Sequence, residues 1–418
     1  MEGSWVLVLT VFATFFIEMG TVKSFGVLFN PMQESLLSST AQLGTVLGMT
    51  HSLGLLLAPL TGNIARTFDH RLCVITGGGL LFVGCFVSAF VHNVYQLAIT
   101  LTITGIGLSL AYIPQVLLLL KAFPTRFSLI FGIAGAGGSF GMMVCPPIVE
   151  ILTNTYGWRG AMMISAAMVS HVFAFGALQR LPKTEYAKLK VTSTAESSAE
   201  KRKGASSCLR GLVSSIIRRL SLQLCIANPR VLLHLTTWLL LGANFHAWVV
   251  FLVPHATTRG IGSTEAAFLS TVGGIGHFIG RVIHPFILDY KITTAFGMFL
   301  TLSVLNTLSF FVDRVVGDNC TALMFLAFVN GGAIGTINLI IISVSKEIYE
   351  ERYHVDIFVL GNCLFGAGEI LGGYLAGGMY DLTRSYSASF LSLGVMSALT
   401  LVMTIADRLA SQCSSEHD

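Results

Sequence analysis

The sequence predicts an all-α membrane protein with twelve transmembrane helices. Of its 418 residues, 53% are hydrophobic and only 11% are charged, whereas a soluble domain carries about 25% charged residues. The mean hydropathy of +0.75 points the same way. A soluble protein has too little interior to bury this many apolar side chains, so we expect lipid to solvate the excess.

Twelve apolar runs are long enough to cross about 30 Å of hydrocarbon, which takes about 20 helical residues. The first six lie at 4–29, 41–65, 71–92, 94–120, 127–153 and 158–179. The second six lie at 231–254, 264–288, 293–312, 320–345, 353–379 and 385–407. We therefore predict two six-helix bundles, 1–179 and 231–408, a polar linker at 180–230 and a tail at 409–418.

The distribution of basic residues predicts the orientation. With both termini in the cytoplasm, 19 of the 25 Lys and Arg residues fall in inner segments and four in outer loops, and basic residues are retained on the cytoplasmic side. Residues 209–226 place apolar residues among Arg210, Arg218 and Arg219, which predicts a helix on the membrane surface or a solvated linker helix. Six helices, a cytoplasmic linker and six more helices form the layout of a major facilitator, whose two halves rock about a central site.

Several polar residues lie inside predicted helices, where a charge costs on the order of 3 kcal/mol and needs a partner or a watery cavity. His277, Arg281 and His284 are spaced i, i+4 and i+7, so they share one helix face. The other intramembrane polar residues are Glu18, Lys23, His51, Asn244, His246 and Glu369.

Two of these residues are isolated cations. Lys23 and Arg281 are predicted to lie roughly 9–10 Å inside opposite surfaces of the membrane, an arrangement that suits an anion passing between them. Arginine presents a planar fork that matches a carboxylate, and lysine presents a point charge. The alternative is that each side chain snorkels to the nearer surface and anchors its helix.

The remaining polar residues allow two interpretations. For His51, His246 and His284 we favour hydrogen-bonded packing over a functional role. Glu18 and Glu369 cannot snorkel far, so we expect them to be protonated or paired with the cations. Together with His51 and Asn244 they are candidates for a proton or polar relay.

Glycine is abundant in two of the predicted helices. The first group is Gly132, Gly135, Gly137, Gly138 and Gly141, and the second is Gly366, Gly368, Gly372, Gly373, Gly377 and Gly378. Small residues at such spacing let helix backbones approach closely. Static packing and contacts that must slide during transport explain the pattern equally well.

Two sequence signatures point to a family. The opening Glu2-Gly3-Ser4-Trp5 resembles an acidic-Gly-small-Trp signature, although Val6 and Leu7 depart from it. The segment Lys121-Ala-Phe-Pro-Thr-Arg126, followed by the glycine-rich helix at 132–141, is similar to a second signature. On these motifs the chain resembles the monocarboxylate transporter family, solute carrier family 16, nearly from end to end.

The resemblance implies roles for three residues. Lys23 and Arg281 correspond to the family's substrate-binding lysine and arginine, and proton-coupled members place an aspartate where this chain has His277. His277 would complete the substrate site. Proton coupling then runs through His277, has moved to Glu18 or Glu369, or has been lost, and we favour weak or absent coupling.

We therefore expect a carrier of a monocarboxylate or related small organic solute in the plasma membrane. The resemblance adds a single-span accessory glycoprotein as a partner. The alternatives are a facilitative carrier of amino acids, creatine or hormone-like solutes, and a sensor that binds a solute without transporting it. The sequence has no nucleophile-base or H-E-x-x-H constellation, and its eight cysteines show no paired spacing. We expect no enzymatic activity, cofactor, metal or nucleic-acid partner.

Overall fold

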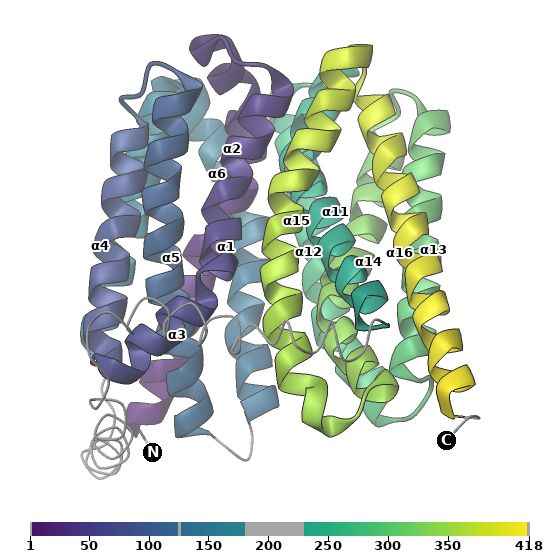
Figure 1. Cartoon of the computed structure of the whole chain (residues 1–418). Coiled ribbons are helices and arrows are strands. Elements are labelled where there is room, and N and C mark those ends of the chain that lie inside the picture. Colours follow the sequence, from purple (N-terminus) through teal and green to yellow (C-terminus); the bar gives the residue numbers. More distant parts are fainter. Residues whose placement is uncertain (1, 124–126, 180–229, 416–418) are drawn as a thin grey trace, which may run out of the picture.

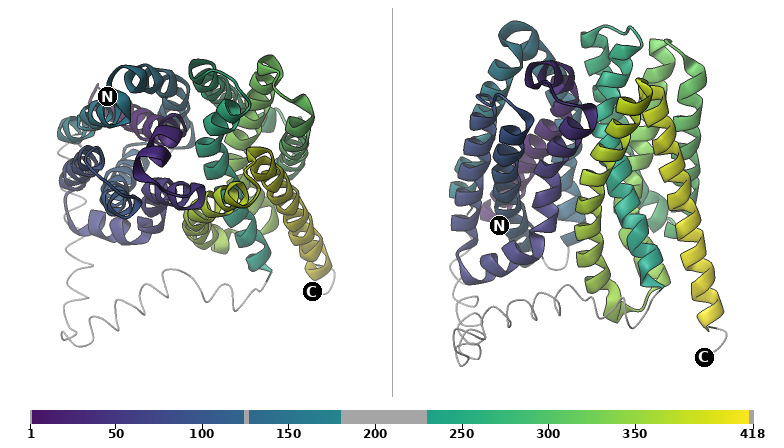
Figure 2. Two further views of the ribbon diagram at one scale, coloured as in Figure 1. Left: turned by 90° about the horizontal axis from the view of Figure 1, so that it is seen from above. Right: turned by 45° about the horizontal axis from the view of Figure 1, so that its top comes forward.

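The computed structural model describes residues 2–123, 127–179 and 230–415 as two helical bundles side by side (Figures 1 and 2). The N-terminal bundle comprises α1 (Glu2–Leu36), α2 (Thr40–Leu56), α3 (Ala58–Thr67), α4 (His70–Ser88), α5 (Val94–Ala122), α6 (Phe127–Val169) and α7 (His171–Leu178). The C-terminal bundle comprises α11 (Val231–Thr258), α12 (Ser263–Asp289), α13 (Ala295–Val316), α14 (Cys320–Ile348), η1 (Glu351–Tyr353), α15 (His354–Thr383) and α16 (Tyr386–Ser415).

The predicted boundaries between the segments fall partly outside these residues. Apart from Arg230, the predicted linker at 180–230, with its surface helix at 209–226, lies outside the described residues. The helix α16 continues to Ser415, past the predicted end of the second bundle at residue 408.

Twelve membrane crossings follow from the described helices. Ten helical segments are long and apolar enough to span a membrane, and α2 with α3 forms one more span, bent by 46°. One of the ten, Ile130–Leu178, contains two crossings, because Gly157 inside α6 has a φ of 68° and breaks the helix. Beyond this break Arg159 donates hydrogen bonds to the carbonyls of Ala89 and Val91 after α4, and the chain returns alongside α4. The predicted fold class is confirmed.

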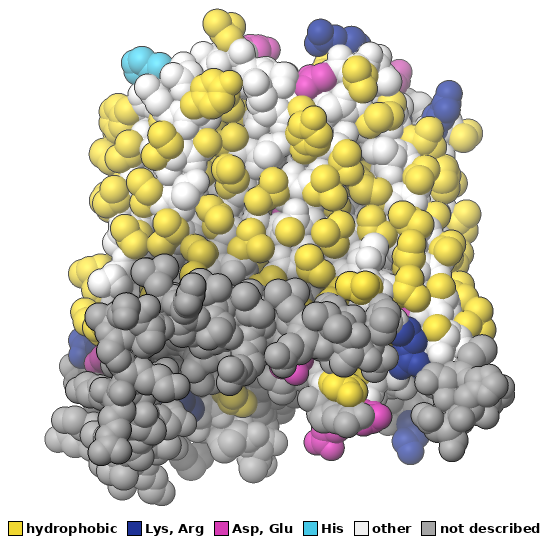
Figure 3. All heavy atoms as spheres, viewed as in Figure 1, with side chains coloured by type: hydrophobic (Ala, Val, Ile, Leu, Met, Phe, Trp, Pro, Cys, Tyr) yellow, Lys and Arg dark blue, Asp and Glu magenta, His cyan; other side chains and the backbone are white. Residues whose placement is uncertain are grey.

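The outer surface matches a protein solvated by lipid. Figure 3 shows hydrophobic side chains over the middle of the face and charged side chains at its upper and lower margins. Leu9, Ile99, Ile151 and Phe325 are among the large apolar side chains that are about two-thirds exposed. Both chain ends lie at the lower end in Figure 1. We call this the termini end and the opposite one the far end.

Aromatic and polar contacts join the two bundles at the far end. The rings of Phe29 on α1 and Phe251 on α11 have centroids 5.2 Å apart. The next residue of α1, Asn30, donates a hydrogen bond of 3.0 Å from Nδ2 to Thr257 Oγ1. The carboxylate of Asp381, near the end of α15, accepts hydrogen bonds from the first two backbone N–H groups of α2, at 3.0 and 2.9 Å. A carboxylate at a helix N-terminus is favoured by the helix dipole.

The hydrogen bonds between the bundles continue from the far end to about the middle of the helices. On α2, the Ser52 hydroxyl donates to the carbonyl of Gly366 at 2.6 Å. Between α12 and α6, the hydrogen bond nearest the termini end runs from Arg281 Nη1 to the carbonyl of Gly135, at 3.2 Å. The structure is therefore a state in which the far end of the interface is closed.

The glycines divide into two kinds of contact. A Cβ on Gly372 would lie 2.1 Å from the carbonyl oxygen of Ala243, within the C-terminal bundle. A Cβ on the next residue, Gly373, would lie 2.3 Å from the carbonyl oxygen of Gly44, in the other bundle. Gly378 on the same helix has open space around it. Static packing thus explains Gly372, whereas Gly373 is needed for closure between the bundles.

This division predicts different effects for three alanine substitutions. Gly373→Ala should hinder far-end closure, because overpacking costs typically 1–3 kcal/mol. In a chain carrying Asn30→Cys and Thr257→Cys, the yield of cross-link between the two cysteines should fall roughly tenfold. Gly378→Ala should leave the yield unchanged, and Gly372→Ala should lower the stability of the C-terminal bundle. A Gly373→Ala protein that cross-links as well as its parent would contradict the assignment.

Candidate functional site

Lys23 lies deep in the interface between the bundles. Its side chain is fully buried, and its Nζ sits 3.7 Å from the ring centroid of Trp248 on α11, in the opposite bundle. No described residue offers Nζ a hydrogen bond. The side chain therefore does not extend to a membrane surface as a snorkelling anchor would. The cation–π contact compensates part of the desolvation of the amine.

Arg281 approaches the same interface from α12. It is half-buried, its Nη1 bonds the carbonyl of Gly135 on α6, and its Nε has no partner among the described residues. A Cβ at position 135 would lie 3.6 Å from Nη1, so the glycine admits the guanidinium. In the part of the chain that the structure describes, neither Arg281 nor Lys23 forms an ion pair with a carboxylate.

His277 lies one turn before Arg281. It is buried, and its Nδ1 is 2.8 Å from the hydroxyl of Ser139 on α6. The three residues predicted to bind substrate thus each contact the opposite bundle, Lys23 at Trp248, His277 at Ser139 and Arg281 at Gly135. The third member of the predicted stripe, His284, bonds the carbonyl of Gly280 in its own helix.

Three other predicted residues form a second cluster, which we call the buried triad: Glu18 on α1, His51 on α2 and Glu369 on α15. His51 Nδ1 is 2.7 Å from a Glu369 carboxylate oxygen, and His51 Nε2 is 3.7 Å from a Glu18 carboxylate oxygen. Their relative exposures are 9% for Glu18, 6% for His51 and 0% for Glu369. His51 is thus paired with carboxylates from both bundles.

Asn244 and His246 lie outside the buried triad. Asn244 donates to the carbonyl of Leu393 within the C-terminal bundle, at 3.0 Å. His246 Nε2 is 3.1 Å from the carbonyl of Gly44 across the interface. The structure therefore does not bring Asn244 to the relay in which the sequence placed it.

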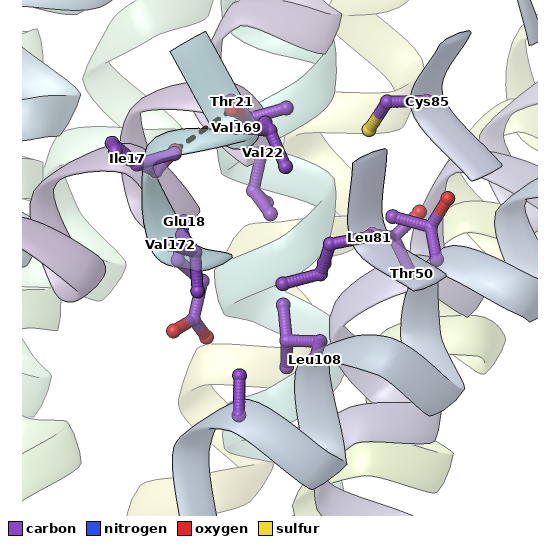
Figure 4. A pocket seen from close by; sticks show the side chains of 12 residues that line it. Ile17, Glu18, Thr21, Val22, Thr50, Leu81, Cys85, Leu108, Val169 and Val172 are labelled. Atoms are coloured by element: carbon purple, nitrogen blue, oxygen red, sulfur yellow. Dashed lines mark hydrogen bonds between the residues drawn. The ribbon is translucent and has the colours of Figure 1, made fainter. Parts of the chain in front are cut away.

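A cavity inside the N-terminal bundle adjoins the buried triad. Figure 4 shows Glu18 on its wall with Thr50, Leu81 and Leu108. Glu18 is the only charged side chain among the described residues that line it. The cavity does not include Lys23 or Arg281, so it is separate from the site of those cations.

Two residues near these clusters could not be predicted from the sequence. Trp248 lies in a continuous apolar run, and its contact with Lys23 depends on how the two bundles pack together. Tyr112 on α5 stacks on Phe15 with ring centroids 5.2 Å apart and lies within electrostatic reach of Glu18 and Arg281. Within the described ranges, no group of three His, Cys, Asp or Glu side chains is arranged to hold a metal.

The fold and the buried polar interface define a membrane transporter. A sequence profile described as the Major Facilitator Superfamily matches residues 10–313, and the chain belongs to this superfamily. Solved structures with the same fold include the peptide transporter POT in complex with sulfate, with a TM-score of 0.73, 15% identity and coverage of 97% of this chain and 94% of that one. The nucleoside transporter NupG has a TM-score of 0.70, 15% identity and coverage of 98% and 99%.

The predicted resemblance to monocarboxylate transporters is confirmed. The chain is 25% identical over 391 residues to monocarboxylate transporter 13 of Bos taurus, covering 93% of this chain and 86% of that protein. It is 26% identical over 427 residues to monocarboxylate transporter 6 of Mus musculus, covering 99% and 89%. A match to monocarboxylate transporter 12 of Xenopus laevis, 25% identical over 298 residues, spans 69% of this chain and 63% of that protein.

The burial of Lys23 predicts that its substitution stabilises the fold. Burying an amine without a hydrogen-bond partner is costly whether or not the amine keeps its charge. Lys23→Met preserves the length of the side chain and removes this cost, so the protein should unfold at a temperature a few degrees higher in a thermal melt.

The control for this measurement is Lys346→Met, which removes an exposed lysine in the last turn of α14 and should barely move the melting temperature. A clear drop in the melting temperature of Lys23→Met would mean that Lys23 stabilises the closed interface rather than being held there at a cost.

Proposed function

We propose that this transporter moves a monocarboxylate or a related small organic solute across the plasma membrane by alternating access. The observation that carries the proposal is the pair of cations at the interface, Lys23 from the N-terminal bundle and Arg281 from the C-terminal bundle. Neither has a carboxylate partner among the described residues. The names of the similar monocarboxylate transporters support the class of solute.

A carboxylate bound between these cations completes their hydrogen bonding. The guanidinium of Arg281 uses one N–H on the Gly135 carbonyl and keeps others for a carboxylate, which it holds in a bidentate geometry. Lys23 adds a point charge from the opposite bundle. Because the two cations belong to different bundles, the solute bridges the interface, and its binding affects how the bundles are positioned.

The far end is closed by contacts of Phe29, Asn30 and Asp381, so we expect solute to reach the site from the termini end. We assign the termini end to the cytoplasm, on the excess of basic residues predicted there. The single-span accessory glycoprotein implied by the family resemblance stays a prediction.

The carboxylate site itself carries cationic and neutral groups. His277 takes the place of an acid, and its Nδ1 is engaged with Ser139. An acid–arginine pair that could exchange a proton as the solute arrives is therefore missing at this position. We therefore propose that this site binds the negatively charged solute and does not bind a transported proton.

Substitution of Arg281 tests this proposal. Arg281→Lys keeps the positive charge but loses the planar fork, and hydrogen bonds to charged groups contribute about 1.5–3 kcal/mol. Uptake should fall at least tenfold while the protein still reaches the cell surface. The control is Arg314→Lys, an exposed position at the end of α13 that should transport normally.

The solutes for this test are lactate, pyruvate, ketone bodies, aromatic amino acids and creatine, each offered at two pH values in a host without endogenous carriers. Unchanged uptake by Arg281→Lys would remove Arg281 from the substrate site. Failure of the parent to take up any carboxylate-bearing solute would count against the proposed solute class.

A further inference from the structure

The buried triad of Glu18, His51 and Glu369 is not used by the carboxylate site. Its members come from three helices and from both bundles. The short contact, 2.7 Å between His51 and Glu369, crosses the interface, whereas the 3.7 Å contact between His51 and Glu18 lies within the N-terminal bundle. Three buried ionisable side chains at a moving interface call for a physical explanation, because burial of net charge is strongly unfavourable.

The surroundings of the buried triad do not neutralise two carboxylates. Of the described residues, no lysine or arginine forms an ion pair with Glu18 or Glu369. The ionisable groups that face the triad from the other packed elements are Tyr112 on α5, His246 on α11 and Arg281 on α12. Tyr112 is a phenol and carries no positive charge. In the described structure His246 bonds the carbonyl of Gly44, Arg281 bonds that of Gly135, and neither forms an ion pair with Glu18 or Glu369.

Protons are the remaining means of neutralisation. Two carboxylates with a neutral imidazole carry a charge of −2, and each bound proton removes one unit. The triad is electrically neutral when it holds two protons, for example with His51 positively charged between one ionised and one protonated glutamate. Such an arrangement also satisfies the short hydrogen bond between His51 and Glu369.

Close packing around the buried triad disfavours a larger cation. A Cβ on Gly48 would lie 3.0 Å from His246 Nε2 and 3.2 Å from the carbonyl oxygen of Glu369, so α2 and α15 leave little space between them. Ser52 closes the next turn with its 2.6 Å hydrogen bond to Gly366. Within the described chain, the side chains do not converge on a metal position.

Opening of the far end would separate the members of the buried triad. Glu369 moves with the C-terminal bundle, and Glu18 and His51 move with the N-terminal bundle. Once Glu369 leaves His51 and water reaches both, the carboxylates are solvated and no longer need protons to remain stable. The closed state therefore binds more protons than the open state, and thermodynamic linkage requires that protons favour closure.

We propose that Glu18, His51 and Glu369 form a proton-binding site that couples protonation to closure of the far end. This proposal rests on alternating access, the mechanism under the proposed function. It assigns proton linkage to a site apart from the cations that bind the carboxylate. Glu18 also lines the cavity of Figure 4, so it connects this site to that cavity.

The experiment follows the distance between the bundles without any solute. Spin labels are attached to Tyr95→Cys on α5 and Val315→Cys on α13, two exposed positions at the far end of opposite bundles, in a chain whose native cysteines are replaced by alanine. Distances are then recorded by pulsed electron paramagnetic resonance between pH 5.5 and pH 8.5, with labelling completed beforehand at one pH.

For the parent, the closed population should grow as the pH falls, with a ratio of closed to open that changes by up to tenfold per pH unit for each linked proton. Glu369→Gln keeps a hydrogen-bonding partner for His51 without needing a proton, so it should hold the far end closed throughout the pH range. His51→Gln and Glu18→Gln should each weaken the pH dependence.

Asp407→Asn is the matched control. Asp407 is a fully buried carboxylate 3.2 Å from His234, but both residues belong to the C-terminal bundle. Asp407→Asn removes a buried carboxylate paired with a histidine, as Glu369→Gln does, but at a place away from the interface between the bundles. The pH response of the far-end distance should therefore persist. If Asp407→Asn does not fold, His234→Gln serves the same purpose.

Two outcomes would overturn the proposal. One is a parent whose far-end distance does not respond to pH although it opens and closes with solute. The other is a Glu369→Gln protein that keeps the pH response of the parent. Solute uptake measured on the same proteins separates this failure from a failure of the proposed function, since a carrier without proton linkage would still transport.

Discussion

The cost of placing charge in hydrocarbon governs the arrangement of this protein. Lys23, Arg281, Glu18 and Glu369 lie within helices that cross the membrane, and the structure directs them to the surface where the two bundles meet. The lipid-facing surface is left apolar (Figure 3). Because these four groups lie where the two bundles meet, any movement of one bundle against the other changes their environment.

The close approach of α2 and α15 makes this interface sensitive to small changes. Gly44 and Gly373 bring the two backbones into direct contact, and Asp381 caps α2 from the opposite bundle. Close-packed helix contacts have low compressibility, so a small separation of the two backbones breaks the contact rather than stretching it. Two members of the buried triad, His51 and Glu369, lie on this helix pair, so closure of the far end and pairing of His51 with Glu369 occur together.

In the proposed mechanism, the two polar clusters have different tasks. Lys23, His277 and Arg281 present positive and neutral groups suited to an organic anion, whereas the buried triad presents two acids and a base. A histidine rather than an acid beside Arg281 does not remove acidic chemistry from the interface, because the buried triad supplies it elsewhere.

The amino-acid sequence by itself determined the number of membrane crossings, the two-bundle layout and the identity of most intramembrane polar residues. These follow from hydropathy and from the energetic cost of burying charge, which act locally along the chain. Gly157, which splits α6 into two crossings, lies between two apolar runs that were predicted separately.

Only the tertiary structure decided which polar residues act together. Glu369 is 318 positions from His51, and Trp248 covers Lys23 from the other bundle. The same docking left Asn244 apart from the relay and separated Gly372, which packs within one bundle, from Gly373, which packs between two. Such pairings depend on how two bundles meet across an interface, and periodicity within a single helix shows which face a residue occupies but not what that face contacts.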